Sequence, residues 1–320
     1  MKDTILFGDC RETLKNLTNS SARMCVTSPP YYGLRDYGGE KNQIGQEESP
    51  EEYVKQMVEV FRLVRDVLTD DGTLWLNIGD SYYNYRSDGN YPKQTVSKTR
   101  QDLPQNTPVR GNKLKGLKSK DLIGIPWMLA FALRADGWYL RQDIIWHKPN
   151  PMPESVKDRC TKAHEYIFLL SKSKNYFYDN EAIKEPAKDW GTRDRTNGKY
   201  HNPGSGLAPH SGLTKSYPTK NKRSVWSVTK KPYKGAHFAV FPPELIEPCI
   251  LAGSEVGDTI LDPFMGSGTS AMVAKSLGRY YTGCELHEDY GNLIQERIQN
   301  YHPVQEVAQE PTINILDLIQ

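Results

Sequence analysis

Four consecutive residues, Ser28-Pro29-Pro30-Tyr31, combine side chains and backbone that could do chemistry. They follow an apolar run at residues 22–26 that is typical of a buried strand. Proline has no N–H and holds φ at about −65°, so two prolines in a row form a stiff loop that presents a carbonyl at a set position. The Ser28 hydroxyl is a second acceptor, and Tyr31 has a flat aromatic face. The segment therefore predicts a site that accepts N–H groups and stacks on a planar ligand.

A second segment has the pattern of a cofactor site. An apolar run ends at Asp262 and is followed by a glycine-rich turn and a helix that begins near Thr269. The next strand ends at Glu285, 23 positions after Asp262, where an acid is well placed to bind ribose hydroxyls. A Walker phosphate loop needs a lysine after its last glycine, and none follows Gly268. Because Asp262 would also repel phosphates, the pattern predicts a site for a cationic nucleoside without phosphate.

Together the two segments resemble the motifs of the amino-methyltransferases of DNA, which use S-adenosylmethionine. "DPFMGSGTS" is similar to their cofactor motif, and "TSPPY" is similar to their catalytic [DNS]-P-P-[YFW] motif. The catalytic motif comes first and a basic region separates the two, which is the permuted order of the β class. The segments "LFGDCRETL", "GTLWLNIGDSY", "KAHEYIFLLSKS" and "HFAVFPPELIEPCI" also resemble family landmarks. The resemblance covers nearly the whole chain except residues 84–120 and 186–235.

The resemblance implies S-adenosylmethionine as the cofactor and assigns residues to its site. Asp9 would contact the adenine ring, and the segment from His237 would lie beside the methionine moiety. The implied cofactor-binding residues are Asp9, Cys10, Thr27, Ser28, His237, Phe238, Phe241, Pro242, Asp262, Pro263, Phe264, Gly266, Ser267, Gly268, Thr269, Glu285 and Leu286. The implied catalytic residues are Ser28, Pro29, Pro30 and Tyr31. No metal is expected.

The implied reaction explains why a stiff loop of acceptors is needed. An exocyclic amine on a base is a poor nucleophile, since its lone pair is delocalised into the ring. Acceptors around its N–H groups, here Ser28 Oγ and the Pro29 carbonyl, favour the pyramidal geometry that attacks a methyl carbon. Tyr31 would stack on a base extruded from the duplex. Serine at the first motif position is more typical of cytosine N4 methylation, which we expect, and adenine N6 methylation stays open because a hydroxyl can serve either base.

Other chemistries and functions compete with this hypothesis. Pro248-Cys249 could supply the thiolate that cytosine C5 methylation needs, but residues 244–251 read as mid-helix, which favours a small core residue. Methylation of RNA or of a protein amide, and a catalytically silent DNA-binding module, are the other hypotheses. The missing Walker lysine argues against a nucleotide hydrolase. His147 and His164 either contact substrate or are satisfied histidines, and Asp80 either contacts the base or caps a turn.

Positive charge is concentrated in two segments. Residues 84–120 hold nine Lys or Arg and two acids, and residues 186–235 hold eleven and two, although the whole chain carries only +2. Tyr and Trp side chains are interleaved with this charge, which favours nucleic acid as the partner. We expect double-stranded DNA to bind through the second segment. The expected contacts are Arg193, Arg195, Lys199, Lys220, Lys222 and Arg223.

The remaining pattern predicts the fold. Apolar runs near residues 4–8, 22–28, 72–83, 138–149, 164–173, 258–264 and 280–286 read as strands, and residues 49–72, 121–137, 241–254, 268–278 and 288–301 read as helices. This alternation predicts an α/β, Rossmann-like, doubly wound and mostly parallel sheet with helices on both faces, the class I methyltransferase fold in permuted order. Residues 1–185 and 236–304 would form one catalytic domain. Residues 84–120 would be a mobile basic loop, 186–235 a target-recognition insertion and 305–320 a tail.

Composition limits the remaining classes. The chain has 320 residues and five scattered cysteines without a C-x-x-C pair, which supports neither a zinc site nor a disulfide framework. No apolar run approaches the roughly 18 residues that a membrane span needs, and no secretory signal is evident. We expect a cytoplasmic, nucleoid-associated protein of bacterial or phage type. A homodimer and a cognate restriction endonuclease are partners that only the resemblance implies.

Overall fold

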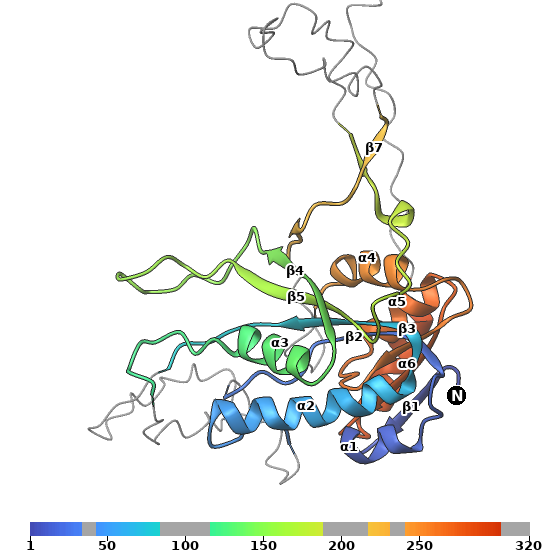
Figure 1. The fold of residues 1–320 in the computed structure, drawn as a ribbon, viewed down its shortest axis with the longest axis horizontal. Helices are drawn as coiled ribbons and strands as arrows, with labels where there is room; N and C mark the ends of the chain where they lie inside the picture. Colours follow the sequence, from blue (N-terminus) through green and yellow to red (C-terminus); the bar gives the residue numbers. More distant parts are fainter. Residues whose placement is uncertain (34–42, 84–115, 188–216, 231–240, 302–320) are drawn as a thin grey trace, which may run out of the picture.

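An eight-stranded sheet forms the centre of the protein (Figure 1). The structure is a computed structural model that describes residues 1–33, 43–83, 116–187, 217–230 and 241–301. Across the sheet the strands follow the order β1-β10-β9-β2-β3-β5-β4-β8. Their bounds are Thr4–Phe7 for β1, Tyr280–Glu285 for β10, Thr259–Asp262 for β9, Ala22–Thr27 for β2, Leu68–Ile78 for β3, His164–Ser171 for β5, Tyr139–His147 for β4 and Val225–Ser227 for β8.

The pairing of the strands defines a point where the winding of the chain reverses. Strands β1, β10, β9, β2 and β3 are all parallel, β5 is antiparallel to both of its neighbours, and β8 is parallel to β4. From β9 the chain continues to β10 on one side, whereas from β2 it continues to β3 on the other. Ligands in open α/β sheets bind outside the carboxyl ends of the strands at such a point. The edge at β9 and β2 is therefore where a site is expected.

Helices cover both faces of the sheet (Figure 1). One face packs against α1, α2 and α3, which span Cys10–Thr13, Pro50–Val67 and Ile125–Ala135, and against the short 3-10 helix Leu14–Asn16. The other face packs against α4, α5 and α6, which span Pro243–Gly253, Thr269–Ser276 and Tyr290–Asn300, and against the 3-10 helix Glu181–Ile183. The predicted fold class, with a mostly parallel sheet between two helical layers, is confirmed.

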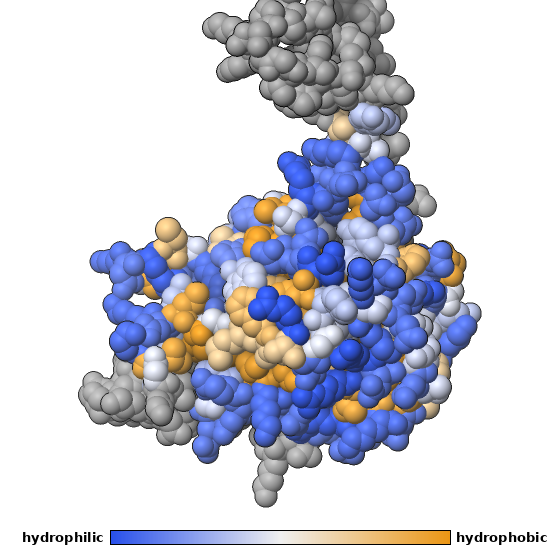
Figure 2. All heavy atoms as spheres, in the orientation of Figure 1, coloured by the Kyte–Doolittle hydropathy of each residue, from blue (hydrophilic) through white to orange (hydrophobic). Residues whose placement is uncertain are grey.

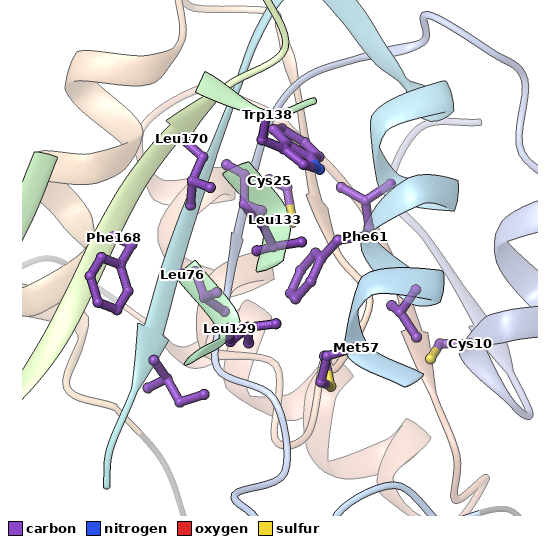
Figure 3. Packing of buried hydrophobic residues seen from close by; sticks show 14 of the residues in the cluster. Cys10, Cys25, Met57, Phe61, Leu76, Leu129, Leu133, Trp138, Phe168 and Leu170 are labelled. Carbon is purple, nitrogen blue, oxygen red and sulfur yellow. The ribbon is translucent and has the colours of Figure 1, made fainter. Parts of the chain in front are cut away.

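Side chains that alternate along the central strands build the two cores. In β2, Cys25 lies in the α2–α3 core, and its neighbours Met24 and Val26 lie in the α4–α6 core. Figure 3 shows Cys25 and Leu76 beside Phe61 of α2 and Leu133 of α3. Strands buried on both faces read as continuous apolar runs, which is why these strands were recognisable in the sequence.

Helix α2 has the predicted start but a different end. Ser49 accepts a hydrogen bond from Glu52 N at 3.2 Å, and Pro50 is the first helical residue. The helix ends at Val67 rather than at Asp71-Gly72, so that prediction was wrong. Leu68 is fully buried and already extended, because it begins β3 and pairs with Ala22 of β2. Gly72 therefore lies within the strand, where a Cβ would be only 2.9 Å from the Cβ of Leu68.

The surface over α3 differs from its surroundings. Figure 2 shows hydrophobic atoms gathered over this helix on a face that is otherwise mostly hydrophilic. Phe131 of α3 is 46% exposed, and the guanidinium of Arg134 lies 4.8 Å from the centre of its ring. The helix thus buries one side against the sheet and leaves this aromatic ring outside.

The predicted recognition insertion is described only in part. Strand β6 (Glu185–Pro186) pairs antiparallel with β7 (Thr219–Lys220) away from the main sheet (Figure 1). Strand β8 also falls within residues 186–235, but it extends the central sheet by pairing with β4, and its Trp226 is buried. The boundaries of the recognition region therefore stay a prediction.

Candidate active site

The two sequence motifs meet at the point where the sheet reverses. Thr27 is the last residue of β2 and Asp262 the last residue of β9, and these strands are parallel neighbours with Cys25 opposite Leu261. The Thr27 hydroxyl donates a hydrogen bond to Asp262 Oδ1 at 2.6 Å, although the residues are 235 positions apart. Parallel strands end at the same edge of a sheet. The Ser28–Tyr31 loop and the glycine-rich turn therefore start side by side.

Asp262 is a buried carboxylate held by its own chain. Its Oδ1 also accepts from Phe264 N at 3.0 Å, and its Oδ2 accepts from the Ser270 hydroxyl. The side chain has no ion-pair partner among the described residues and is only 2% exposed. Burial raises the pKa of Asp262 to about 6, although these hydrogen bonds oppose the rise. A buried acid without a cation is suited to a positively charged ligand.

The glycine-rich turn after Asp262 is fixed by α6. Gly268 has φ of 79° and caps the start of α5, a conformation that favours glycine. A Cβ on Gly268 would lie 2.5 Å from Ile294 Cγ2 of α6. Arg297 Nη1, also from α6, donates to the Ser267 carbonyl at 2.6 Å and bonds its hydroxyl as well. The turn is therefore held in one shape before any ligand arrives.

Glu285 closes the other side of the turn from the end of β10. Its Oε2 accepts from Gly266 N at 2.7 Å and its Oε1 accepts from His287 N at 3.0 Å. Burial raises the pKa of Glu285, and the two backbone hydrogen bonds oppose this. Each oxygen has one bond from the protein and a carboxylate offers about four acceptor positions. Glu285 can thus still accept from ribose hydroxyls.

Two buried polar atoms at this turn lack partners. Thr269 Oγ1 and His287 Nε2 make no hydrogen bond within the described ranges. Thr269 is 3% exposed, and buried hydroxyls are normally paired. A ligand with polar groups would satisfy these atoms, so the residues present fit a nucleoside cofactor without phosphate. His287 was not among the predicted site residues, and its place two residues after the strand-end acid Glu285 was the only signal for it.

The end of β1 lies beside the same site. Gly8 N donates to the Glu285 carbonyl at 2.8 Å, which places Asp9 and Cys10 next to the end of β10. Asp9 accepts from Arg11 N at 2.9 Å and forms an ion pair with the Arg11 guanidinium at 2.6 Å. Burial opposes the shift, but Arg11 lowers the pKa of Asp9. Since Arg11 already engages both oxygens of Asp9, the predicted contact of Asp9 with adenine stays a prediction.

The proline loop is anchored to α2. The Tyr53 hydroxyl, from a fully buried ring, donates to the Pro30 carbonyl at 2.9 Å. Pro29 is buried, and in the part of the chain that the structure describes no hydrogen bond reaches its carbonyl. The Ser28 side chain is half-buried, and its hydroxyl lies 3.5 Å from the Tyr31 hydroxyl. The loop thus keeps two acceptors available, as its sequence predicts.

Tyr31 is tied to a charged pair that the sequence did not reveal. Its hydroxyl lies 2.8 Å from Glu165 Oε2 of β5 and 3.3 Å from Asn77 Oδ1 of β3. Glu165 forms an ion pair with Lys148, which is only 6% exposed. Burial lowers the pKa of Lys148 to about 8, although Glu165 raises it. Burial, with the charge of Glu165, raises the pKa of Tyr31.

Several other candidate residues make contacts within the protein. Asp80 accepts hydrogen bonds from Ser81 N, Gly124 N and Ile125 N, so it caps the start of α3. Cys249 is fully buried in α4, and burial raises the pKa of its thiol, which fits the core residue expected from the sequence. His147 Nδ1 lies 3.0 Å from Ser227 Oγ at the edge of the sheet. His164 packs edge-on against the Tyr166 ring.

The remaining predicted contacts are only partly described. Phe241 and Pro242 lead into α4, with Phe241 packed against the α4–α6 core, and Leu286 is half-buried after β10. Lys220 is exposed on β7, whereas Arg223 pairs with Glu185 at 3.0 Å. Lys222 lies 5.2 Å from the centre of the Trp226 ring. His237, Phe238, Arg193, Arg195 and Lys199 lie outside the described residues.

The fold and the position of the two motifs define a class I methyltransferase. Solved structures of this class have the same fold: the cytosine-N4-specific PvuII DNA methyltransferase matches with a TM-score of 0.60 and 18% identity over 94% of this chain and 89% of that one. TTHA0409 from Thermus thermophilus, solved with S-adenosyl-L-methionine, matches with a TM-score of 0.56 and 24% identity over 92% of both chains.

Sequence comparison identifies the family. A family model described as DNA methylase, covering N6 and N4 methylases, matches residues 22–296. Type II methyltransferase M.XycI of Xanthomonas campestris pv. cyanopsidis is 47% identical over 92% of this chain and 87% of its own length. Type II methyltransferase M.SmaI of Serratia marcescens is 48% identical over 92% and 90%. The chain belongs to this family of S-adenosylmethionine-dependent DNA amino-methyltransferases, which confirms the resemblance seen in the sequence.

The described residues contain neither a membrane-spanning helix nor a cluster of metal ligands. None of the helices there is long and apolar enough to cross a membrane. No group of three or more His, Cys, Asp or Glu side chains in those ranges could hold a metal ion.

Proposed function

We propose that this DNA methyltransferase transfers a methyl group to the exocyclic amine of a base extruded from duplex DNA, and that the base is cytosine, modified at N4. The observation that carries the proposal is the contact between Thr27 and Asp262. It brings the loop of acceptors and the cofactor turn to one edge of the sheet. A group held at one motif can therefore reach a group held at the other.

The cofactor half of the site would act by binding and orienting. S-adenosylmethionine supplies an electrophilic methyl group on a sulfonium when it is bound. The buried Asp262 carboxylate would favour its cationic part, and Glu285 would accept from its ribose hydroxyls. The unpaired hydroxyl of Thr269 would find a polar partner there. These assignments and the implied roles of Asp9, Cys10, Phe241, Pro242 and Leu286 are part of the proposal.

The acceptor half would prepare the amine. Ser28 Oγ and the Pro29 carbonyl would each accept one N–H of the target amine, which draws its lone pair out of conjugation. Because Tyr53 holds the neighbouring Pro30 carbonyl at 2.9 Å, the loop need not reorganise when the base enters. The Tyr31 ring would stack on the base, which must leave the duplex before its amine can be reached.

The choice of base rests on one position. Ser28 supplies a neutral hydroxyl where a carboxylate would be more typical of an adenine N6 enzyme. The PvuII enzyme, which has the same fold, is cytosine-N4-specific, and this supports N4 as the first candidate. Adenine N6 is the second candidate, because both bases offer an amine beside a ring-nitrogen acceptor.

The decisive experiment identifies the product. Mixed-sequence duplex DNA would be incubated with the protein and labelled S-adenosylmethionine, digested to nucleosides and analysed by mass spectrometry. N4-methylcytosine is expected, N6-methyladenine would establish the second candidate, and no methylated nucleoside from DNA would refute the proposal. RNA and protein substrates are tested in parallel, since methylation confined to either would also refute it.

Variants of Ser28 and Asp262 test the proposed roles of the acceptor loop and of the cofactor turn separately. We expect Ser28→Ala to reduce kcat by about 10²- to 10³-fold with little change in cofactor affinity, since it removes one acceptor of the transition state. Asp262→Ala should abolish cofactor binding measured by calorimetry. Ser276→Ala, at the far end of α5, is the matched control and should keep both properties. Unchanged cofactor affinity in Asp262→Ala would contradict the assignment.

The partners of the enzyme follow from the same proposal. Lys220, Lys222 and Arg223, together with Arg193, Arg195 and Lys199, would contact DNA on either side of the extruded base. The cytoplasmic location, a homodimer and a cognate restriction endonuclease remain predictions from the family resemblance. The names of the relatives as Type II methyltransferases support the last of these.

A further inference from the structure

A line of polar groups runs from the predicted acceptor loop into the sheet. It begins at Ser28 Oγ, passes the Tyr31 hydroxyl at 3.5 Å and reaches Glu165 Oε2 at 2.8 Å from that hydroxyl. Lys148 closes the line by its ion pair with Glu165 Oε1. The four residues come from the loop after β2, the start of β5 and the end of β4. The described contacts of Glu165 thus link it directly to the loop that is proposed to hold the amine.

The number of protons on these groups determines which of them donates each hydrogen bond. An ionised carboxylate can only accept hydrogen bonds, so Glu165 must receive the Tyr31 proton. Asn77 competes weakly, because its oxygen is farther away at 3.3 Å and is uncharged. Its amide nitrogen is occupied by the Tyr166 carbonyl at 3.1 Å, so the oxygen faces Tyr31. With its one proton committed to Glu165, the Tyr31 hydroxyl can only accept from Ser28.

The same reasoning extends to the target. When the Ser28 hydroxyl donates to Tyr31, its lone pairs are left to accept from an incoming N–H. The distance of 3.5 Å is long, but hydrogen bonds in free enzymes often tighten only when the substrate is bound. A Ser28 hydroxyl turned the other way would point its proton at the amine and compete for the lone pair. The orientation of this hydroxyl is therefore important for the reaction.

We propose that Glu165, paired with Lys148, is a positioning residue that orients the hydroxyls of Tyr31 and Ser28 so that Ser28 accepts a hydrogen bond from the target amine. The inference rests on the proposed function, since it assigns the acceptor to that site. It adds a role for two residues that touch neither the cofactor motif nor the base. Lys148 supports the carboxylate from the buried side, where an unpaired charge would be costly.

Close packing at Gly79 also restricts the position of the Tyr31 ring. A Cβ on Gly79 would lie 2.7 Å from Tyr31 Cε2 and 3.2 Å from Glu165 Cγ. Only glycine therefore lets the Tyr31 ring and the Glu165 side chain pack together over the end of β3. This close packing limits the positions that the Tyr31 hydroxyl can adopt.

A double-mutant cycle tests the proposal. Glu165→Gln keeps the shape of the side chain, but its amide can also donate, so the direction of the line is no longer enforced. We expect kcat for DNA to fall by about 10- to 100-fold, with cofactor and DNA affinity within about twofold of the wild type. In a Tyr31→Phe background, where the line is already broken, Glu165→Gln should have almost no further effect. Equal losses in both backgrounds, or an unchanged kcat, would overturn the proposal.

A spectroscopic measurement does not depend on turnover. The ¹³Cζ chemical shift of Tyr31, assigned by its loss in Tyr31→Phe, reports the hydrogen bond that the hydroxyl donates. Because Glu165 Oε2 accepts that bond at 2.8 Å, Glu165→Gln should shift the signal at neutral pH. An unchanged shift would show that Glu165 does not act on Tyr31. If the wild type failed to methylate DNA, the proposed function would fail, while this measurement would still test the contact.

Lys172, at the end of β5 opposite to Glu165, provides a control. Lys172 pairs with Asp70 at 3.4 Å and donates to the Leu68 carbonyl at 2.7 Å, directly after β5. Lys172→Met removes a partly buried lysine as Lys148→Met does, but far from the loop. We expect Lys148→Met to lower kcat and Lys172→Met to leave kcat unchanged. An equal effect of the two variants would point to a general loss of stability and overturn the specific role.

Discussion

Asp262, which is proposed to bind the cofactor, is a buried acid that lowers the stability of the fold. Its carboxylate is 2% exposed and is held only by hydroxyl and amide donors. A buried charge without a counterion is costly, and proteins keep such groups mainly at functional sites. A cationic ligand would supply the missing charge. The residue is therefore poised for a ligand in a way that a salt bridge within the protein would prevent.

This cost predicts a variant that is more stable than the wild type. The rise of the Asp262 pKa from 3.8 to about 6 means that the folded protein binds the proton more tightly than the unfolded chain. The stabilising effect of protonation is complete below pH 3.8 and is lost as the pH rises through 6, at a cost of about 3 kcal/mol. Asp262→Asn avoids this loss, because its amide oxygen can still accept from Thr27 and Phe264 N, while its NH2 can donate to the Ser270 hydroxyl instead of accepting from it.

Unfolding measured across pH checks this expectation. Asp262→Asn should be more stable than the wild type at pH 7 by up to about 3 kcal/mol, and the difference should vanish near pH 4. Cofactor binding should be weaker at both values. Asp70→Asn is the control, since the Asp70 side chain is 97% exposed and its loss should change stability by less than about 0.5 kcal/mol. A variant that is less stable than the wild type at pH 7 would contradict the account.

Among the secondary-structure elements, α6 has an unexpected share in the cofactor turn. Its Ile294 packs against Gly268, and its Arg297 binds the Ser267 carbonyl at 2.6 Å. Strand β10 holds the turn from the other side, where Gly266 N donates to Glu285 Oε2 at 2.7 Å and Met265 N donates to the Cys284 carbonyl at 2.9 Å. A helix that follows in sequence only after β10 thus helps to fix the shape of the turn.

Gly268→Ala tests this coupling between the turn and α6. The added methyl group would require φ of 79° in an alanine and would collide with Ile294, 2.5 Å away. We expect a loss of about 1–3 kcal/mol in the free energy of unfolding and weaker cofactor binding. Adding Ile294→Ala should relieve the collision and restore part of the cofactor affinity, which calorimetry would measure. Gly116→Ala, where nothing lies within 4 Å, is the control for positive φ alone. No difference between the two glycine variants would show that Ile294 is not involved.

Over the whole molecule, charge separates the two basic segments, which are predicted to bind DNA, from the rest of the chain. The segments 84–120 and 186–235 carry 20 of the 41 Lys and Arg residues, so the remainder of the chain is acidic. DNA would be attracted to these segments and repelled elsewhere, which orients the protein during the encounter. In Figure 1 the β6–β7 pair stands away from the sheet, which would leave Lys220 of β7 accessible to a duplex.

Charge reversal at β7 tests this orientation. The double variant Lys220→Glu, Arg223→Glu should weaken DNA binding and reduce the magnitude of the salt slope by about two, since about one counterion is released for each phosphate contact. Lys15→Glu, Lys275→Glu makes the same change in net charge outside both basic segments and should leave the slope nearly unchanged. Equal slopes for the two double variants would exclude β7 as a docking surface.

The sequence was sufficient for the two motifs and for most strands and helices of the main layers, because these depend on local patterns, whereas α1 and the short strands β6, β7 and β8 were not predicted. Buried strands appear as apolar runs, and Ser49-Pro50 is typical of a helix start. Asp262 and Glu285 each end an apolar run. Where local signals competed, the prediction failed: Asp71-Gly72 is typical of a helix end, yet pairing of Leu68 with β2 drew these residues into a strand. Asp80 could not be assigned from its neighbours, because its partners Gly124 and Ile125 are 44 and 45 positions away.

The contacts on which the site depends were decided by the order of the strands. Thr27 and Asp262 touch because β2 and β9 are neighbours, and Glu165 meets Tyr31 because β5 returns antiparallel beside β3. Hydrophobic periodicity records whether a residue is buried but not which strand lies next to its own. Side chains that are 134 or 235 positions apart thus acquire their chemistry only when the sheet assembles.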